Sequence, residues 1–315
     1  MRGTNQKLTA FWLQNGPQML HITEISESDT QTSYPVTSVV WSGKTAFCDS
    51  VVFADSPTYG RMLFLDGELQ SAAADEAIYH ESLVHPVMAS HSSVASDSPS
   101  KRVLVVGGGE GATVREVLKW STVSEVIWVD IDVELVKMCR EYLRWAPAVY
   151  DDPRVRFIGK DIREVLDGLG TFDVIILDLP DPDGDTEYLY SDSFWKDLAT
   201  ALRMDGRIVT HVGPVRPFGP IGLGLERVWD SAQAARFEPW IWGFYSTVIP
   251  SFQGSWGFWI TGPPSRHMNE LPFGLSVVDE EQLRQWQSPT LVWRTALDGL
   301  REKGVAVGRC GPFDR

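Results

Sequence analysis

A chain of 315 residues with 43% hydrophobic residues is long enough for one large or two unequal globular domains. Its 28 basic against 42 acidic residues give a net charge of −14, which argues against nucleic acid or an anionic membrane as a partner and is compatible with a cationic ligand. Three widely spaced cysteines indicate neither a disulfide framework nor a zinc site, and the apolar runs stay short of the roughly 18 residues that span a bilayer. We therefore expect a cytoplasmic protein that binds no metal.

The first part of the chain is predicted to form a small antiparallel sheet. Residues 38–41, 50–54 and 61–65 are short β-branched or aromatic runs separated by turn residues. Asp66-Gly67, between Leu65 and Glu68, is a typical hairpin turn, so the last of these runs should fold back on itself.

A helix is predicted after this sheet, with Asp75 at its cap and Pro86 kinking or ending it. Tyr79 lies one turn after Asp75 and shares a face with it. His80 falls on the apolar side, so we interpret it as a packed histidine rather than a ligand.

The stretch from Val103 to Glu116, VLVVGGGEGATVRE, predicts a buried strand, a glycine turn and the start of a helix. The glycines, Gly107 to Gly109, let a ligand approach backbone N–H groups, and the helix start adds a positive end. Glycine turns also occur where nothing binds, so this motif alone leaves both readings open.

Strands and helices alternate regularly beyond this turn, and acids follow the strand ends at Asp130, Asp161 and Asp178. This pattern predicts an α/β fold with a doubly wound, Rossmann-like sheet of the methyltransferase type, in which ligands bind beyond the carboxyl ends of the strands. Gly107 and the three acids should therefore converge on one cleft. The alternative for each acid is that it only caps the next helix.

A polar, proline-containing stretch at residues 90–100 separates the two parts and is interpreted as a linker. The predicted domains are an N-terminal β domain with its connecting helix, residues 1–95, and the Rossmann-like catalytic domain, residues 96–315.

Each of these acids has a role if the ligand is a nucleoside. Asp130 lies near the spacing at which an acid binds ribose hydroxyls, and Asp161 is placed to accept from an adenine amine. Glu110, directly after the glycines, would repel a pyrophosphate or an amino-acid carboxylate and attract a free amine. Decarboxylated S-adenosylmethionine carries a sulfonium and an amine but no carboxylate, and it matches Glu110 best.

Several longer stretches resemble the polyamine aminopropyltransferase, or spermidine synthase, family. They are LFLDGELQSAAADEAIYHESLVHP, VLVVGGGEGATVREVLKW, VDID, DPRV and DVIILDLPDP, in the family's order and spacing. GGGEG, DID, DLPDP and IPSFQGSWGF are most similar to its thermospermine and triamine/agmatine branch. The resemblance implies a homodimer or homotetramer that moves the aminopropyl group of decarboxylated S-adenosylmethionine to a polyamine acceptor and releases methylthioadenosine.

The resemblance also implies roles for individual residues. Gly107 and Gly109 line the donor; Gln70 and Tyr79 contact the donor tail or the acceptor; Glu110 binds the aminopropyl amine; Asp130 binds the ribose and Asp161 the adenine; Asp178 and Asp181 bind the reacting amine and the acceptor. Because an ammonium is no nucleophile, Asp178 is expected to act as the base or proton relay, with Tyr79 orienting the amine. The acidic segment after Asp181 is expected to form a lid.

Three positions depart from the family pattern. His211 and Cys48 stand where the family commonly has glutamine, and Phe252 stands where putrescine-specific relatives usually place tyrosine. With Leu179-Pro180 replacing two serines, the acceptor pocket should be longer and more apolar, which favours spermidine or agmatine. The alternatives are a putrescine-using spermidine synthase, an S-adenosylmethionine-dependent methyltransferase, and a polyamine- or nucleoside-binding relative that has lost the reaction.

Overall fold

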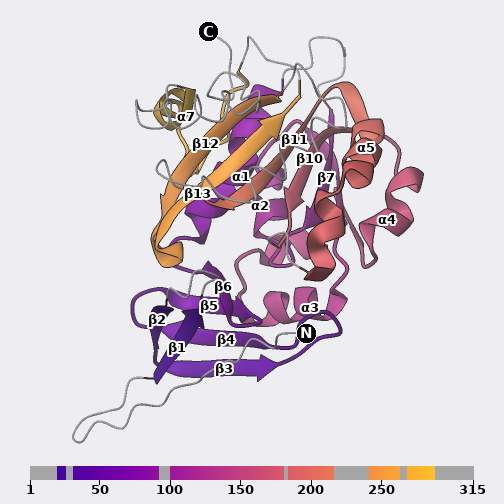
Figure 1. Ribbon diagram of the computed structural model, residues 1–315. Helices are drawn as coiled ribbons and strands as arrows, with labels where there is room; N and C mark the ends of the chain where they lie inside the picture. Colours follow the sequence, from indigo (N-terminus) through magenta and orange to yellow (C-terminus); the bar gives the residue numbers. More distant parts are fainter. Residues whose placement is uncertain are drawn as a thin grey trace, which may run out of the picture.

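The computed structural model describes residues 20–25, 31–91, 100–180, 184–215, 241–262 and 268–287. Figure 1 shows two small N-terminal sheets at the lower end of the molecule and a large sheet flanked by helices above them. The predicted boundary at residues 95 and 96 lies within residues 92–99, outside the described residues, and stays a prediction.

The predicted antiparallel sheet is confirmed and has a fourth strand. Its order is β3-β4-β5-β6, with bounds Ser38–Gly43, Val51–Ser56, Gly60–Leu65 and Glu68–Ala72. Asp66 and Gly67 both have positive φ, 49° and 93°, as a two-residue hairpin between right-twisted strands requires. A further hairpin precedes this sheet, formed by β1 (Leu20–Ile25) and β2 (Gln31–Val36), and the sequence analysis had not identified it.

Helix α1 (Glu76–Ser90) joins the two parts of the chain. It runs through Pro86, so of the two alternatives predicted for this proline, that it ends the helix is wrong. Asp75 occupies the cap position, but its side chain makes no cap hydrogen bond. It accepts instead from the backbone N–H and the hydroxyl of Ser251, at 2.7 and 2.9 Å, because this distant segment packs against the helix start.

The large sheet has seven strands in the order β12-β13-β11-β10-β7-β8-β9. The strand bounds are β7 Lys101–Gly107, β8 Val123–Val129, β9 Val155–Ile158, β10 Phe172–Asp178, β11 Leu202–Pro214, β12 Ile241–Ile249 and β13 Gly254–Thr261. β7 to β11 are parallel, and β13 runs antiparallel to β11 and β12. The chain leaves β7 toward β8 and β9 and then returns to β10 on the other side of β7. That reversal creates the crevice in which such sheets bind ligands.

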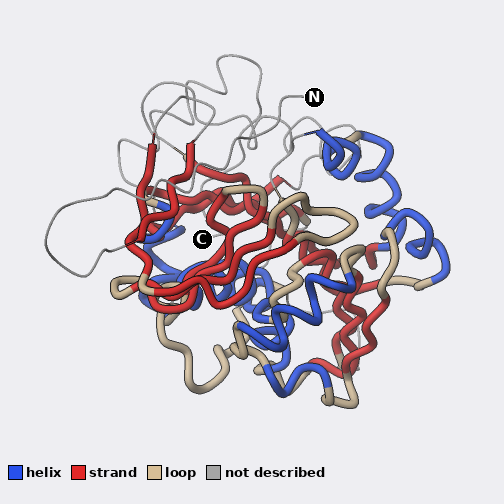
Figure 2. Tube along the Cα trace, turned by 90° about the horizontal axis from the view of Figure 1, so that it is seen from below, coloured by secondary structure: helices blue, strands red, loops and turns tan. Residues whose placement is uncertain are grey.

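Helices cover both faces of this sheet (Figure 2). Their bounds are α2 Ala112–Leu118, α3 Val133–Tyr142, α4 Ile162–Val165, α5 Asp192–Ala201 and α7 Glu280–Gln287, with short 3-10 turns η1 Pro147–Tyr150, η2 Leu166–Gly168, η3 Gly184–Tyr190 and η4 Pro250–Phe252. Alternate residues of β7 pack toward α1 and α2 on one side and toward α4 and α5 on the other. This two-sided burial explains why the strand reads as a continuous apolar run.

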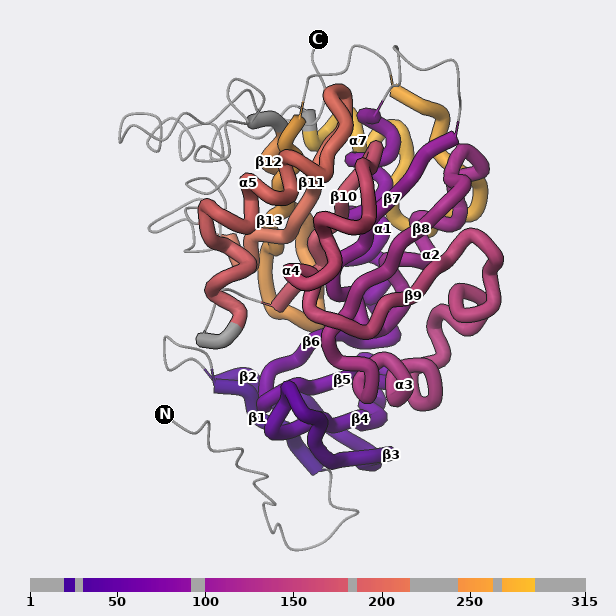
Figure 3. The backbone as a smooth tube through the Cα atoms, turned by 90° about the vertical axis from the view of Figure 1, so that its right-hand side faces the viewer, coloured from indigo at the N-terminus to yellow at the C-terminus, as the bar shows by residue number. Residues whose placement is uncertain are grey.

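Helix α3 packs against the four-stranded N-terminal sheet, as Figure 3 shows. Leu135 and Cys139 of the helix lie against Val51 and Phe53 of β4. The N-terminal sheet therefore sits beside the carboxyl end of β8, from which α3 emerges. None of the helices in the described parts of the chain combines the length and the apolar character that a membrane span requires.

Candidate active site

The glycine turn is fitted against the end of β10. Gly107 pairs with Asp178 in the register of β7 and β10, and it has a φ of 79°. A Cβ on Gly107 would lie 2.1 Å from the Asp178 carbonyl oxygen, and the Gly108 N–H donates to that oxygen at 2.9 Å. The indole N–H of Trp128 donates to the Gly107 carbonyl at 2.8 Å. Close packing thus demands glycine here, in addition to any ligand that approaches the turn.

Asp178 and Tyr79 meet at this turn, although they are 99 residues apart in the chain. The Tyr79 hydroxyl donates to Asp178 Oδ1 at 2.8 Å, and the Thr113 hydroxyl donates to Oδ2 at 2.5 Å. Burial and the neighbouring Asp178 charge raise the pKa of Tyr79 well above its usual value, so the phenol remains a donor. Thr113 was not among the predicted site residues.

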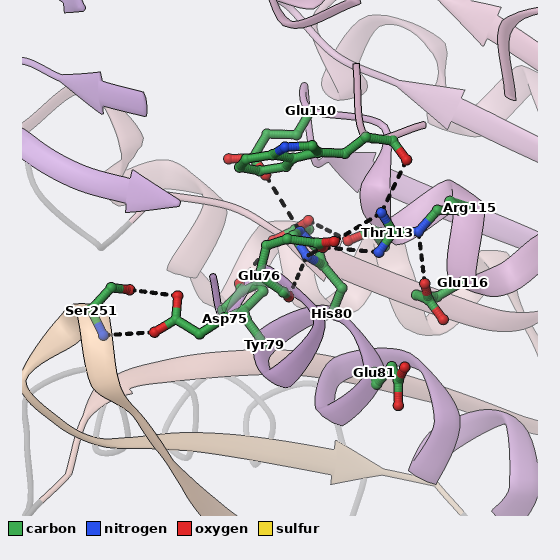
Figure 4. Close-up of polar contacts among 12 residues, drawn as sticks. Asp75, Glu76, Tyr79, His80, Glu81, Glu110, Thr113, Arg115, Glu116 and Ser251 are labelled. Carbon is green, nitrogen blue, oxygen red and sulfur yellow. Dashed lines mark hydrogen bonds and ion pairs between the residues drawn. The ribbon is translucent and has the colours of Figure 1, made fainter. Parts of the chain in front are cut away.

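Glu110 lies beyond the glycines and faces His80 (Figure 4). A distance of 3.6 Å separates Glu110 Oε2 from His80 Nε2. Burial, with a smaller contribution from Asp178, raises the pKa of Glu110 to about 8 against the opposing effect of His80. His80 is packed, as predicted, but its ring also borders the predicted donor site.

His80 is held by Glu76, which is held in turn by Arg115. His80 Nδ1 lies 2.8 Å from Glu76 Oε2, and the Arg115 guanidinium donates to both Glu76 oxygens at 3.0 and 2.8 Å. Burial alone would lower the pKa of His80, but Glu76, Glu110 and Asp178 together raise it to about 9. Burial raises the pKa of Glu76, but His80 and Arg115 together lower it by more. The pKa of Glu76 is therefore about 2. Sequence reasoning missed Glu76 and Arg115 because only the fold places α1 beside α2.

Asp130 is buried next to the glycine turn, as predicted. A Cβ on Gly109 would lie 3.3 Å from Asp130 Oδ2, and Oδ1 accepts from the backbone N–H of Asp132 at 2.8 Å. Burial raises the pKa of Asp130 to about 7, with Asp132 and Asp178 adding to the increase. Glu110 and Asp130 therefore both lie within electrostatic range of Asp178.

The N-terminal domain reaches this part of the cleft through the loop between β3 and β4. The Thr45 hydroxyl donates to Asp132 Oδ2 at 2.5 Å. Cys48, in the same loop, is half-buried, and burial together with Asp66 and Asp132 raises the pKa of its thiol to about 11. Cys48 is therefore a neutral side chain close to these acids.

Asp161 caps helix α4. Capping was the alternative to ligand binding that the sequence left open for it. Its carboxylate accepts from the backbone N–H of Arg163 at 2.9 Å and pairs with the Arg163 guanidinium. The Arg163 hydrogen bonds lower the pKa of Asp161, so it remains ionised. Both carboxylate oxygens of Asp161 accept from Arg163, and Tyr188 adds a further hydrogen bond, so adenine binding stays a prediction.

An aromatic group formed by His211, Phe252 and Trp256 borders Tyr79. The ring of His211 stacks on Trp256 with centroids 5.9 Å apart, and Phe252 lies 4.7 Å from Trp256. Tyr79 lies 6.1 Å from His211 and 6.3 Å from Phe252. His211 Nε2 donates to the carbonyl of Leu179, which fixes the ring against the segment that follows Asp178.

Two predicted site residues are not tied to this cluster by a described contact. Gln70 donates to the carbonyl of Glu68 in its own strand at 3.4 Å, and its role stays a prediction. Asp181 and the start of the predicted lid lie outside the described residues.

Comparisons with known proteins identify the family of this chain. The family described as spermine/spermidine synthase domain matches residues 76–264, and the spermidine synthase tetramerisation domain matches residues 20–72. Polyamine aminopropyltransferase 2 of Pseudomonas aeruginosa is 36% identical over 248 residues, which cover 75% of this chain and 66% of that protein. Polyamine aminopropyltransferase 1 of Hyperthermus butylicus is 38% identical over 228 residues, 70% of this chain and 73% of that one.

Among solved structures, spermidine synthase from Thermotoga maritima superimposes with a TM-score of 0.70, covering 88% of this chain and 92% of that one at 23% identity. A likeness at this identity establishes the fold, with its Rossmann-like sheet and N-terminal β structure.

Proposed function

Because the chain belongs to the spermine/spermidine synthase family, we propose that it transfers the aminopropyl group of decarboxylated S-adenosylmethionine to a polyamine amine. One observation carries the proposal. The Asp178 charge contributes to raising the pKa values of two buried neighbours, Glu110 and Asp130. Buried acids that are only partly compensated are costly, and a sulfonium with ammonium groups relieves that cost.

The donor binds along the carboxyl edge of β7 and β8. Glu110 receives the aminopropyl ammonium, Asp130 the ribose hydroxyls and Asp161 the adenine amine, while Gly107 and Gly109 leave room for the tail. The carboxylate of ordinary S-adenosylmethionine would meet Glu110 and be repelled. This arrangement selects the decarboxylated donor.

The transfer is a displacement at the carbon beside the sulfonium. The neutral acceptor nitrogen forms a bond to that carbon, the carbon–sulfur bond breaks, and methylthioadenosine leaves with the electron pair. The proton of the acceptor passes to Asp178, whose carboxylate is oriented by Tyr79. Holding the amine in line with the sulfonium supplies part of the acceleration.

The acceptor pocket is bordered by Phe252, Trp256 and His211 next to Tyr79. This aromatic border favours a long acceptor with several methylenes, so spermidine or agmatine is preferred over putrescine. Asp181 binds a distal ammonium of that acceptor.

A panel of amines incubated with each donor tests this function. Methylthioadenosine should form from decarboxylated S-adenosylmethionine with spermidine or agmatine, and that donor should bind more tightly in calorimetry than the carboxylated one. S-adenosylhomocysteine as the product would indicate a methyltransferase. Donor binding without product from any amine would indicate a non-catalytic relative. A putrescine kcat/KM at least tenfold higher would indicate a spermidine synthase of the putrescine-using type.

We further propose that the chain forms a homodimer or homotetramer through its N-terminal domain. The match of residues 20–72 to the tetramerisation domain supports this assembly. Val39 and Val40 of β3 are 40% and 37% exposed, and Phe47 in the loop after it is 55% exposed. Exposed apolar side chains on an edge strand are typical of a surface that another copy covers.

A further inference from the structure

The carboxylate of Asp178 is held by two hydroxyl groups from two different helices. Tyr79 of α1 donates to Oδ1 at 2.8 Å, and Thr113 in the first turn of α2 donates to Oδ2 at 2.5 Å. Each oxygen retains one lone pair that can accept a proton from an amine. Two donors on opposite oxygens fix the plane of the carboxylate, whereas one donor would allow it to rotate.

The backbone around Asp178 is fixed as well. The Gly108 N–H donates to the Asp178 carbonyl at 2.9 Å, and a Cβ on Gly108 would lie only 2.8 Å from Oδ2. The glycine turn therefore approaches Asp178 closely from one side, and Thr113 approaches from the helix that follows the turn. Thr113 itself is fully buried, with 0% exposure.

The direction of the Thr113 hydroxyl is informative. A threonine in the interior of a helix commonly donates to a backbone carbonyl of the preceding turn, but Thr113 is the second residue of α2 and has no helical turn before it. Here the hydroxyl donates to a carboxylate that lies 65 residues later in the sequence, at the end of β10. A bond to a charged acceptor is also stronger than one to a neutral carbonyl. Asp178 therefore satisfies a buried hydroxyl that has no acceptor in its own helix.

We infer that Thr113 is a positioning residue that orients the Asp178 carboxylate toward the acceptor amine, together with Tyr79. The inference rests on the proposed role of Asp178 as proton acceptor. Thr113 need not touch either substrate, so its effect should fall on the transfer step and not on donor binding. A misplacement of about 1 Å at such a group can lower a rate by as much as about a hundredfold.

Two substitutions separate the hydroxyl from the shape of the side chain. Thr113→Val removes the hydroxyl and keeps the β-branched volume, whereas Thr113→Ser keeps the hydroxyl and removes a methyl group. Thr113→Val should lower kcat by about tenfold to a hundredfold and change the donor KM less than about twofold. Thr113→Ser should retain kcat within about threefold of the parent. Thr113→Ala serves in place of valine if that variant does not fold.

A double-mutant cycle with Asp178→Asn shows whether Thr113 acts through Asp178. The Asp178→Asn variant should lose at least about a hundredfold in kcat, as expected when a general base is removed. In that background, Thr113→Val should cost less than about threefold more, because the group that it orients is already disabled.

The outcomes distinguish this inference from the proposed function. Unchanged kcat in Thr113→Val, with a large loss in Asp178→Asn, overturns the positioning role and leaves the function intact. Equal losses in the serine and valine variants, or fully additive losses in the cycle, also overturn it. Nearly full activity of Asp178→Asn would show that Asp178 is not the base, and would overturn both the positioning role of Thr113 and the proposed transfer mechanism.

Discussion

The buried carboxylate of Glu110 lowers the stability of the folded chain when it is ionised. Burial raises the pKa of Glu110 to about 8 because the ionised carboxylate has lost much of its water, and His80 compensates only part of that loss. Without a ligand the ionised Glu110 carboxylate is poorly solvated, and a bound cation would stabilise it. Stability and donor binding therefore place opposite demands on Glu110.

Glu110→Gln should bind the donor more weakly and fold more stably. The donor KM should rise at least about tenfold, because a charge-assisted hydrogen bond to the ammonium is lost. The free energy of unfolding at pH 8 should rise by about 1–2 kcal/mol, because the buried charge is removed. Urea unfolding and steady-state kinetics measure both quantities. A less stable variant with normal donor KM would contradict this assignment.

The stability gain should depend on pH in a defined direction. In the unfolded chain the pKa of Glu110 is near its ordinary value of 4.5, whereas in the folded chain it is about 8. Between these values the unfolded state binds fewer protons, so the Glu110 contribution to stability falls as pH rises. The gain from glutamine should therefore be small near pH 5 and largest near pH 8. A gain that is equal at both pH values would show that Glu110 is not the cause.

The acceptor pocket is also decided by single side chains. Phe252 contacts Tyr79 and Trp256 without offering a hydrogen-bonding group of its own. Phe252→Tyr should lower the ratio of spermidine to putrescine kcat/KM by about fivefold to tenfold, because a phenol can bind the second amine of a short acceptor. Phe273→Tyr, at a fully exposed position, is the control. An unchanged ratio in both variants would place Phe252 outside the acceptor pocket.

At the scale of elements, helices α1 and α2 are joined by a buried ionic network. Glu116 of α2 accepts from His85 of α1 at 2.9 Å, and Arg115 and Lys119 lie 2.8 and 2.6 Å from its oxygens. The same two helices supply Tyr79 and Thr113 to the active site. A loosened contact between them should therefore reach Asp178.

Glu116→Gln should lower the free energy of unfolding at pH 7 by about 2–3 kcal/mol, because it leaves three partners without a buried anion. Burial raises the pKa of Glu116, but hydrogen bonds from His85, Lys119 and Arg115 lower it by more, and the pKa is about 2. Its contribution is present above the unfolded value of 4.5 and is lost as pH falls toward 2. The difference between parent and variant should shrink below pH 4.5.

Glu164→Gln, at an exposed glutamate of α4, is the matched control and should change stability by less than about 0.5 kcal/mol. Equal effects of the two substitutions in urea unfolding would show that the network contributes nothing special.

At the scale of the whole molecule, the N-terminal domain makes one contact with the catalytic domain and presents one exposed apolar strand. Its loop between β3 and β4 contacts Asp132, and its edge strand β3 exposes apolar side chains. Assembly of copies through this strand would also hold the loop in place. Oligomeric state and activity should therefore change together.

Val40→Lys should shift the protein toward smaller species, because a charged side chain would be buried in the contact between copies. Sedimentation velocity at several concentrations measures the change. Met204→Lys, at a position that is 95% exposed, should leave the distribution unchanged. A Val40→Lys variant that sediments like the parent would place the contact elsewhere.

Local patterns predicted much of the fold, because they depend on neighbours in the chain. The hairpin at Asp66-Gly67, the strand that leads into Gly107 and the acids at the strand ends follow from turn chemistry and apolar periodicity. The first hairpin, β1 and β2, was missed because its strands carry weak alternation. The predicted role of Glu110 came from its charge beside the glycines and that of Tyr79 from the family resemblance, and no periodicity could assign either.

The sequence by itself determined the α/β class, the family and the strand ends at which Gly107, Asp130 and Asp178 lie, since each depends on a short run of residues. Only the tertiary structure decided that Thr113 and Tyr79 donate to the same carboxylate, that of Asp178. It also decided that Arg115 holds Glu76, which holds His80 beside Glu110. Those contacts join residues from α1, α2 and β10. Side-chain packing between elements distant in the chain sets their distances and their charges, and no local pattern encodes it.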